Sequence, residues 1–179
     1  SNDYPIYKAK GECFLRGWHG KNYTIVRPAI TYSKRRCQLI NLERPQIFGA
    51  IKKDEPIVLC NEAMNVQATM SWAGDVAEML ARLFFNSAAF GEDFNVSTAE
   101  HRTWGEIAGY YADIFGAKFE IADKEAYLTA RNGGKPCEKW QRWQLDYDRL
   151  FDRVMDNSKI LAATGLKQSE FTSVRDGLA

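Results

Sequence analysis

The residues best suited to chemistry lie at the start of the chain, where Tyr4 and Lys8 form a Tyr-x-x-x-Lys motif. On a helix, positions i and i+4 share a face, so the phenol and the ammonium can lie side by side. A tyrosine on its own has a pKa of about 10 and is a poor base at neutral pH. A lysine cation about 4 Å away favours the phenolate by on the order of 4 kcal/mol at an effective dielectric near 20, before lysine desolvation is subtracted. Such a pair is suited to acid/base work on a hydroxyl or a carbonyl.

The composition describes a globular chain with almost no net charge. Its 179 residues include 24 Lys+Arg and 23 Asp+Glu, and 45% of them are hydrophobic. A chain of this length has enough apolar surface for a packed core. A formal charge of +1 creates no long-range field towards nucleic acid or a membrane. The longest uncharged stretch, 63 to 74, is twelve residues, whereas a membrane-spanning helix needs about 20. We therefore expect no membrane segment and no nucleic-acid partner.

The cysteines point to a reduced environment. Cys13, Cys37, Cys60 and Cys137 are far apart, without a Cys-x-x-Cys pair, and the chain has only two histidines. This spacing fits neither a zinc site nor a disulfide scaffold. We expect no metal site, free thiols and a cytoplasmic location.

Short β-like runs alternate with helical stretches, which is typical of an α/β domain. We expect strands at 23–28, 57–60, 66–72, 94–97 and 119–121, and helices at about 5–18, 75–83, 104–115, 123–132 and 157–163. Asp75 is the expected N-cap of its helix. Thr103 and Glu106 form a capping box at the start of another. Apolar residues at helical spacing from Trp140 to Val154 predict a surface helix that packs one aromatic face.

Five short motifs follow one another along the chain. They are Tyr4-x-x-x-Lys8, the strand-like Tyr-Thr-Ile-Val-Arg-Pro at 23–28, Ser71-Trp-Ala-Gly-Asp75, Phe94-Asn-Val-Ser97 with the capping box behind it, and Asp156-Asn-Ser-Lys159. This succession resembles the extended short-chain dehydrogenase/reductase family, the NAD-dependent epimerase/dehydratase group. The similarity covers nearly the whole chain.

The resemblance implies the C-terminal part of a Rossmann-like α/β fold with a small mixed α/β substrate-binding region. Residues 1–33 would end the catalytic helix of the cofactor domain and add the strand after it, and 34–179 would form the substrate-binding region. The glycine turn that admits a dinucleotide pyrophosphate is absent from this sequence. Ser1 and Asn2 look like a cloning scar. We therefore expect the chain to be half of a longer protein.

The resemblance also assigns roles at the cofactor. Tyr4 would be the acid/base that moves a proton to or from the substrate oxygen, and Lys8 would support it and bind the nicotinamide ribose. Pro28 and Ala29 follow the strand that passes the nicotinamide in this family, so they would contact that ring. NAD or NADP is the expected cofactor of the full-length protein, and none is expected on this chain alone.

The stretch behind that strand lines the substrate cleft in the family. Tyr32, Arg35 and Arg36 lie there, and a cluster of cations can hold a substrate phosphate. A solvated basic turn is the alternative interpretation. Many sugar-nucleotide members carry asparagine and then Tyr-Gly-Pro here, whereas this chain keeps only Tyr32. A sugar nucleotide is thus one candidate substrate, and a reductase of another hydroxyl or carbonyl compound stays open.

The resulting hypothesis is an NAD(P)-dependent epimerase, dehydratase or reductase whose isolated C-terminal part is inactive. Its partners would be a small-molecule substrate and a second copy, because a homodimer would cover apolar edges left by half a sheet. A non-catalytic relative that binds RNA through Lys34, Arg35, Arg36 and Trp72 is the alternative, and its affinity would fall steeply with salt. In a third interpretation the domain is unrelated and complete, and Tyr4 and Lys8 diverge.

Overall fold

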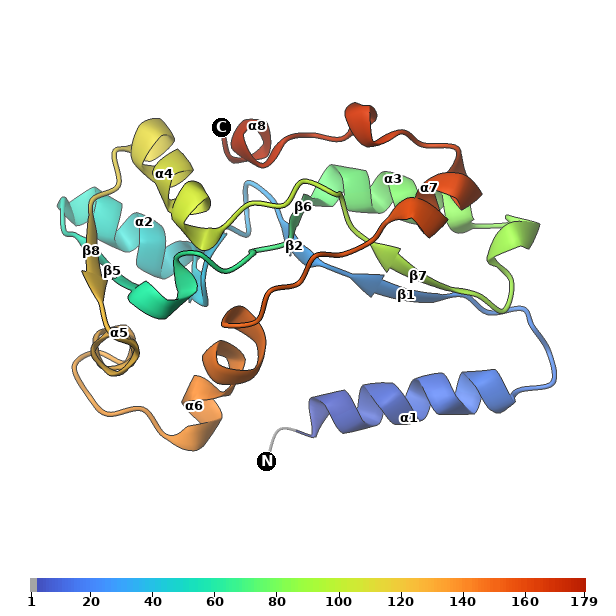
Figure 1. Cartoon of the computed structure of the whole chain (residues 1–179), viewed down its shortest axis with the longest axis horizontal. Helices are drawn as coiled ribbons and strands as arrows, with labels where there is room; N and C mark the ends of the chain where they lie inside the picture. Colours follow the sequence, from blue (N-terminus) through green and yellow to red (C-terminus); the bar gives the residue numbers. More distant parts are fainter. Residues whose placement is uncertain (1–2) are drawn as a thin grey trace.

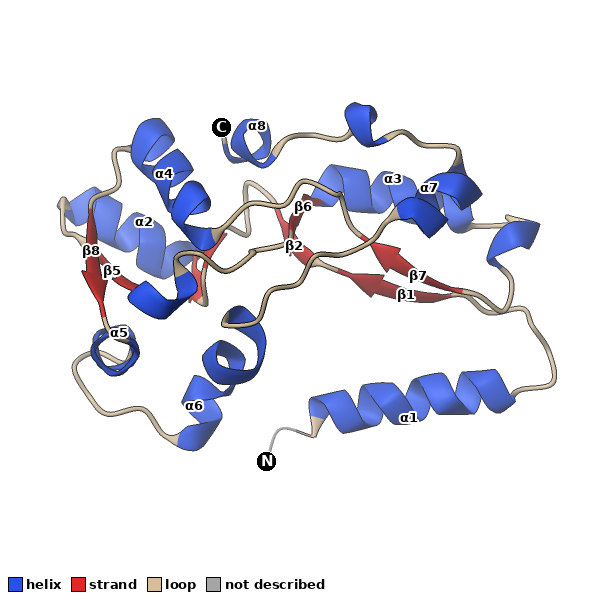
Figure 2. Cartoon of the chain, viewed as in Figure 1, coloured by secondary structure: helices blue, strands red, loops and turns tan. Residues whose placement is uncertain are grey.

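The computed structural model describes residues 3–179 and has an α/β architecture built on short strand pairs (Figures 1 and 2). Three pairs are parallel: β1 (Ile25–Pro28) with β7 (Asp93–Val96), β2 (Ile30–Tyr32) with β6 (Met70–Trp72), and β5 (Ile57–Cys60) with β8 (Phe119–Ala122). A fourth pair, β3 (Gln38–Leu39) with β4 (Leu42–Glu43), is antiparallel. The α/β class predicted from the alternating pattern is confirmed.

Helices connect and cover these strands (Figure 1). They are α1 (Tyr4–Gly17), α2 (Arg44–Lys53), α3 (Ala73–Leu83), α4 (Trp104–Phe115), α5 (Lys124–Arg131), α6 (Lys139–Gln144), α7 (Ser158–Thr164) and α8 (Val174–Leu178). Single turns of tighter helix lie at Asn61–Ala63, Ser87–Ala89 and Gln168–Glu170, and a π-helical turn covers Leu145–Arg149.

The β1–β7 pair carries a helix on each face. Successive side chains of a strand point to opposite faces. Val26 and Phe94 belong to an apolar cluster with α3 and α7, whereas Arg27 and Asp93 bond to α1 on the other face. Figure 1 shows the same arrangement, with α3 on one side of the pair and α1 on the other. A sheet covered on both faces is typical of parallel α/β folds.

A second, larger apolar cluster fills the other end of the molecule. Its fully buried members include Trp104, Ile107 and Tyr111 of α4, Leu59 of β5 and Ile47 of α2. The capping box at the start of α4 is confirmed, because Thr103 Oγ1 accepts from the Glu106 amide and the Glu106 carboxylate accepts from the Thr103 amide. Gly116 ends the helix in the left-handed region, with φ of 68°.

Two expected element boundaries are wrong. Asp75 is not an N-cap, since α3 begins at Ala73 and the carboxylate of Asp75 instead accepts from the amide and hydroxyl of Thr172. The strand expected over 66–72 is restricted to Met70–Trp72, because Thr69 has a φ of 46°, outside the extended region. In both places a contact with a distant segment decides the local structure.

The aromatic face expected after Trp140 is also wrong. Trp140, Tyr147 and Val154 are exposed, and the helix ends at Gln144 in a π-helical turn. Leu145 and Arg149 are the residues that this turn buries. A π-helical turn adds a residue per turn, so the apolar spacing predicted for an α-helix no longer marks one face.

Tyr32 and the C-terminal helix fit closely together. Tyr32 is fully buried, and its hydroxyl donates to the carbonyl oxygens of Ser173 and Val174 at 3.3 Å each. A Cβ on Gly177 of α8 would overlap that hydroxyl and meet ring carbon Cε2 at 3.0 Å. Glycine is therefore required at this point of α8 by the approach of the Tyr32 ring.

We predict that Gly177→Ala lowers the free energy of unfolding by about 1–3 kcal/mol, because the added methyl overpacks against Tyr32. The measurement is urea denaturation followed by circular dichroism. Gly109→Ala is the matched control, since a Cβ there meets nothing within 4 Å, and alanine is expected to stabilise α4 by up to about 1 kcal/mol. Equal effects of the two substitutions would contradict this packing account.

Candidate functional site

Ion pairs position α1 against the β1–β7 pair. Arg27 Nη2 lies 2.5 Å from Glu12 Oε2, and Arg27 Nη1 lies 2.6 Å from Asp93 Oδ2. Arg16 contacts the same two carboxylates at 3.2 and 3.3 Å. No residue of α1 is buried, and an isolated helix of this length is only marginally stable in water. These charges therefore fix where the helix lies.

This network of ion pairs shifts the pKa values of Glu12, Asp93 and Arg27. Hydrogen bonds from Arg27 lower the pKa of Glu12 and the pKa of Asp93 below their ordinary values. The same two contacts raise the pKa of Arg27. The folded state thus favours the charged carboxylates, and their contribution is lost when acid protonates them.

Tyr4 and Lys8 lie together on α1. The ammonium nitrogen of Lys8 is 5.4 Å from the centroid of the Tyr4 ring, within the range of a cation–π contact. Tyr4 is 64% exposed. The two side chains share a face of the helix, as their i, i+4 spacing predicts, and do not diverge as the interpretation of an accidental motif expects.

The pair lies at the end of the fold where β1 finishes. Helix α1 and strand β1 run in opposite directions, so the start of α1 is at the same end as Pro28 (Figure 1). From the Glu12–Arg27 contact, Lys8 lies about 6 Å further along the helix at 1.5 Å per residue, and Ala29 about 7 Å further along the strand at 3.3 Å per residue. Lys8 and Ala29 are thus level with one another.

The predicted nicotinamide contacts differ in exposure. Pro28 is exposed at the end of β1, whereas Ala29 is half-buried and its amide donates to the Val96 carbonyl at 3.2 Å. Side chains alternate along β1, so the Pro28 ring lies on the face of α3 and α7, opposite Arg27 and α1. Ala29 has its main-chain donor engaged within the fold.

The three predicted substrate-binding residues are not brought together. Tyr32 is buried under α8, and burial raises the pKa of its phenol, with the Glu100, Asp75 and Asp176 carboxylates adding to the shift. Arg35 and Arg36 are exposed on a turn in which Ser33 Oγ accepts from both of their amides at 3.2 Å. The turn thus holds two cations at the surface, whereas the Tyr32 side chain is part of the hydrophobic core. Trp72, named for the RNA alternative, packs edge-on against the Tyr32 ring with centroids 5.5 Å apart.

Two further arginines were missed by the sequence analysis. Arg149 is buried, with Nε donating to the Ile40 carbonyl at 2.9 Å and a guanidinium nitrogen paired to Asp148. Arg153 contacts the other oxygen of Asp148 at 2.5 Å. Burial lowers the pKa of Arg149; Asp148 opposes this shift, and the nearby cations Arg153 and Arg36 reinforce it. The only signal was the Arg-x-x-x-Arg spacing, inside a segment interpreted as a surface helix.

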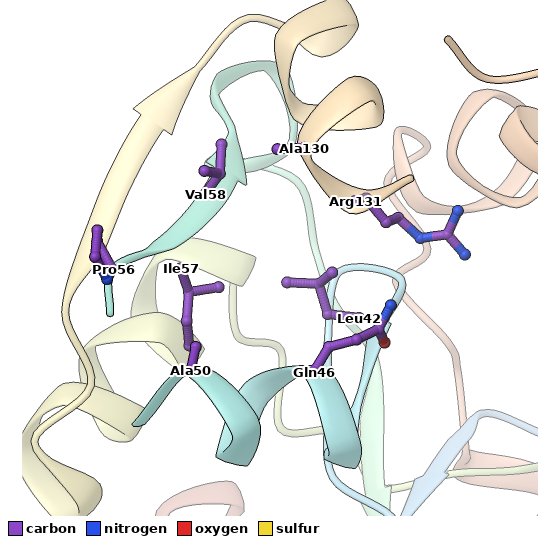
Figure 3. A pocket seen from close by; sticks show the side chains of 8 residues that line it. All are labelled: Leu42, Gln46, Ala50, Pro56, Ile57, Val58, Ala130 and Arg131. Atoms are coloured by element: carbon purple, nitrogen blue, oxygen red, sulfur yellow. The ribbon is translucent and has the colours of Figure 1, made fainter. Parts of the chain in front are cut away.

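Two concavities in the described structure lie away from Tyr4 and Lys8. A small pocket of about 190 Å³ opens between α2, β5 and α5, with Leu42 and Ile57 among its apolar walls and Gln46 and Arg131 as its polar side chains (Figure 3). A hollow of about 620 Å³ lies beside the start of β1 and the end of α3. Tyr4 and Lys8 line neither.

The described residues contain no cluster of three or more His, Cys, Asp or Glu side chains placed to hold a metal ion. No helix among them is both long and apolar enough to cross a membrane. The four cysteines are free thiols.

Comparisons with known proteins place the fold. No sequence-family model and no curated protein sequence matches the chain. Solved structures do match. An epimerase from Methanothermobacter thermautotrophicus has a TM-score of 0.67 at 16% identity over 98% of this chain and 47% of its own. UDP-glucose 4-epimerase from Thermotoga maritima, solved with UDP-glucose, has a TM-score of 0.67 at 17% identity. The match covers 98% of this chain and 50% of that epimerase.

RMD from Pseudomonas aeruginosa, solved with NADPH, has a TM-score of 0.65 at 17% identity. The match covers 99% of this chain and 53% of RMD. The chain therefore spans about half the length of the structures that it resembles. At these identities the likeness concerns the fold, and the expected Rossmann-like α/β fold class is confirmed.

We predict that Arg27→Gln detaches α1 at neutral pH, and that acid does the same to the unaltered chain. The carboxylate pKa values are lowered in the folded state, so the ion pairs stabilise α1 fully above the ordinary carboxylate pKa values of about 4. That contribution is lost as the pH falls through the lowered values. Hydrogen exchange of the α1 amides is the measurement. Lys118→Gln, which breaks the exposed pair with Asp54, is the control and should leave α1 unchanged. Persistent α1 protection in Arg27→Gln would contradict the role of this network.

Proposed function

We propose that this chain is the substrate-binding, C-terminal portion of an NAD(P)-dependent epimerase, dehydratase or reductase that acts on a hydroxyl or carbonyl group. One observation carries the proposal. The Tyr4–Lys8 pair stands level with the end of β1, where Arg27 anchors its helix, in a fold shared with epimerases that were solved with NAD or UDP-sugars.

The proposed chemistry at Tyr4 is proton transfer. In the oxidising direction the phenolate oxygen would take the proton of the substrate hydroxyl. The carbon that bears this hydroxyl would lose a hydride to the oxidised nicotinamide. In the reducing direction the phenol returns that proton to the carbonyl oxygen. The Lys8 ammonium nitrogen lies 5.4 Å from the centroid of the tyrosine ring, on the same face of α1.

The residues at the end of β1 suit the nicotinamide half of a dinucleotide. Lys8 is a donor level with Ala29 that can reach a ribose hydroxyl, whereas the exposed Pro28 ring faces away from α1. When bound, the nicotinamide supplies a hydride acceptor or donor. The described residues offer no glycine turn for the pyrophosphate, so this chain would contribute contacts to the nicotinamide end of the cofactor alone.

The proposed substrate is an anion such as a sugar nucleotide. Arg35 and Arg36 lie exposed on one turn. Burial lowers the pKa of Arg149, and Arg153 and Arg36 each add to this shift. Asp148 is the carboxylate that the structure pairs with both Arg149 and Arg153. This local excess of positive charge favours a phosphate-bearing substrate.

We predict that Tyr4→Phe, made in the complete enzyme, lowers kcat by about 10²- to 10⁴-fold without changing the melting temperature. Removing the hydroxyl removes the proton donor and acceptor but keeps the ring. Steady-state kinetics and thermal denaturation give the two readouts. Tyr7→Phe is the matched control on the same helix, where the hydroxyl is also exposed, and full activity is expected. An active Tyr4→Phe enzyme would exclude the proposed acid/base.

We predict that the isolated chain binds neither NAD nor NADP with measurable heat in titration calorimetry. The reason is that a pyrophosphate needs main-chain donors at a glycine turn, which the sequence lacks. Micromolar affinity of this chain for either dinucleotide would show that the cofactor site is complete within it.

A further inference from the structure

The pocket between α2, β5 and α5 is a second candidate site, away from Tyr4 and Lys8 (Figure 3). Its volume of about 190 Å³ is smaller than the roughly 300–1,000 Å³ of sites for drug-sized ligands. At about 30 Å³ per water molecule, such a volume corresponds to on the order of six waters. The pocket therefore suits a ligand with only a few non-hydrogen atoms.

Most of the pocket wall is apolar. Leu42 and Ile57 are buried members of the large hydrophobic cluster. The other apolar residues of the wall are Ala50, Pro56, Val58 and Ala130. Aliphatic carbons gain free energy at such a wall because their contact with it removes apolar surface from water. We therefore expect the ligand to carry a short aliphatic body.

The polar side chains of the pocket are Gln46 and Arg131. In Figure 3 the Gln46 amide and the Arg131 guanidinium end on the same side of the view, away from Pro56. Gln46 Oε1 already accepts from the Glu43 amide at 2.8 Å, which leaves the Gln46 NH₂ group for a ligand. An arginine side chain offers donors only. The side chains at this end of the pocket thus offer N–H groups and a positive charge to a ligand.

The guanidinium of Arg131 is poorly satisfied within the described chain. Its Nη1 reaches the Gln141 carbonyl at 3.4 Å, and its Nε is buried without a hydrogen-bond partner among residues 3–179. A buried donor without an acceptor costs stability, because it has given up its bonds to water. A ligand oxygen at Arg131 would remove this cost.

Acidic side chains around the pocket are engaged with other cations. Glu125 of α5 and Asp146 both pair with Arg142, at 2.6 and 2.8 Å. Asp54, at the end of α2, pairs with Lys118 at 2.6 Å. These carboxylates leave the positive charge of Arg131 available to an anion.

We propose that this pocket binds a short aliphatic monocarboxylate. The carboxylate lies on Arg131, whose planar guanidinium suits two parallel N–H···O bonds, and Gln46 Nε2 is a further donor. The aliphatic carbons contact Leu42 and Ile57. Inorganic phosphate suits the pocket less well, because its oxygens would find no donors along the apolar wall. This site needs neither nicotinamide nor turnover, so it stands apart from the chemistry proposed for Tyr4.

The test is a titration of the chain with sodium isovalerate, followed by the amide signals in heteronuclear NMR spectra. Isovalerate has a branched aliphatic body and one carboxylate. We expect saturable shifts at Ile57 and Arg131 with a Kd of about 1 mM, a range that fits a ligand of this size. Isovaleramide has nearly the same shape without the charge and should bind at least about tenfold more weakly. Equal binding of isovaleramide, or no saturable shift with isovalerate up to about 20 mM, would overturn the proposal.

Three variants show where the ligand binds. Arg131→Gln is expected to raise the Kd by about tenfold or more, because it removes the charged donor. Ala50→Leu fills the pocket from α2 and leaves Arg131 in place, so binding should be lost. Lys53→Gln is the matched control: Lys53 is an exposed cation at the end of α2 that does not line the pocket, and an unchanged Kd is expected.

The same spectra report whether each variant is folded. An Arg131→Gln chain that binds isovalerate as tightly as the unaltered chain would contradict the proposal. So would a folded Ala50→Leu chain that still binds it, since the ligand would then lie outside this pocket.

Discussion

The contact of Arg27 with Glu12 and Asp93 is the constraint on which the candidate site depends. Helix α1 buries no residue, so it has no apolar contact strong enough to define its position. Arg27 joins the helix to β1 and, through Asp93, to β7. A planar guanidinium with two carboxylates fixes orientation as well as distance. Tyr4 and Lys8 are placed at the end of β1 because the next turns of the same helix are held there.

The two apolar clusters of the molecule differ in their surroundings. The larger one lies around α4 and β5 and includes the fully buried Trp104, Ile107 and Tyr111. The smaller one, between the β1–β7 pair and helices α3 and α7, leaves an open strand edge and exposed aromatic residues. The chemistry proposed for Tyr4 belongs to the incomplete side. This arrangement fits a site that is assembled from two parts of a longer polypeptide.

The arginines considered for substrate binding are held in the fold in different ways. Arg35 and Arg36 are held at the surface by a short turn around Ser33. Arg149 is buried and supports the loop at Ile40, so much of its role is structural. Charges that serve both the fold and a ligand are expected where a binding surface is built on loops.

The sequence alone determined the local features whose signals lie within one element: the Tyr4–Lys8 face and the capping box at Thr103. The tertiary structure decided the rest. Asp75 and Tyr32 acquired their partners from the C-terminal segment, about 100 and 140 residues away, and Arg149 was buried by a π-helical turn that no α-helical period describes. Local propensity and spacing act over one or two turns, whereas the partner of a buried polar group is set by which distant segments pack together.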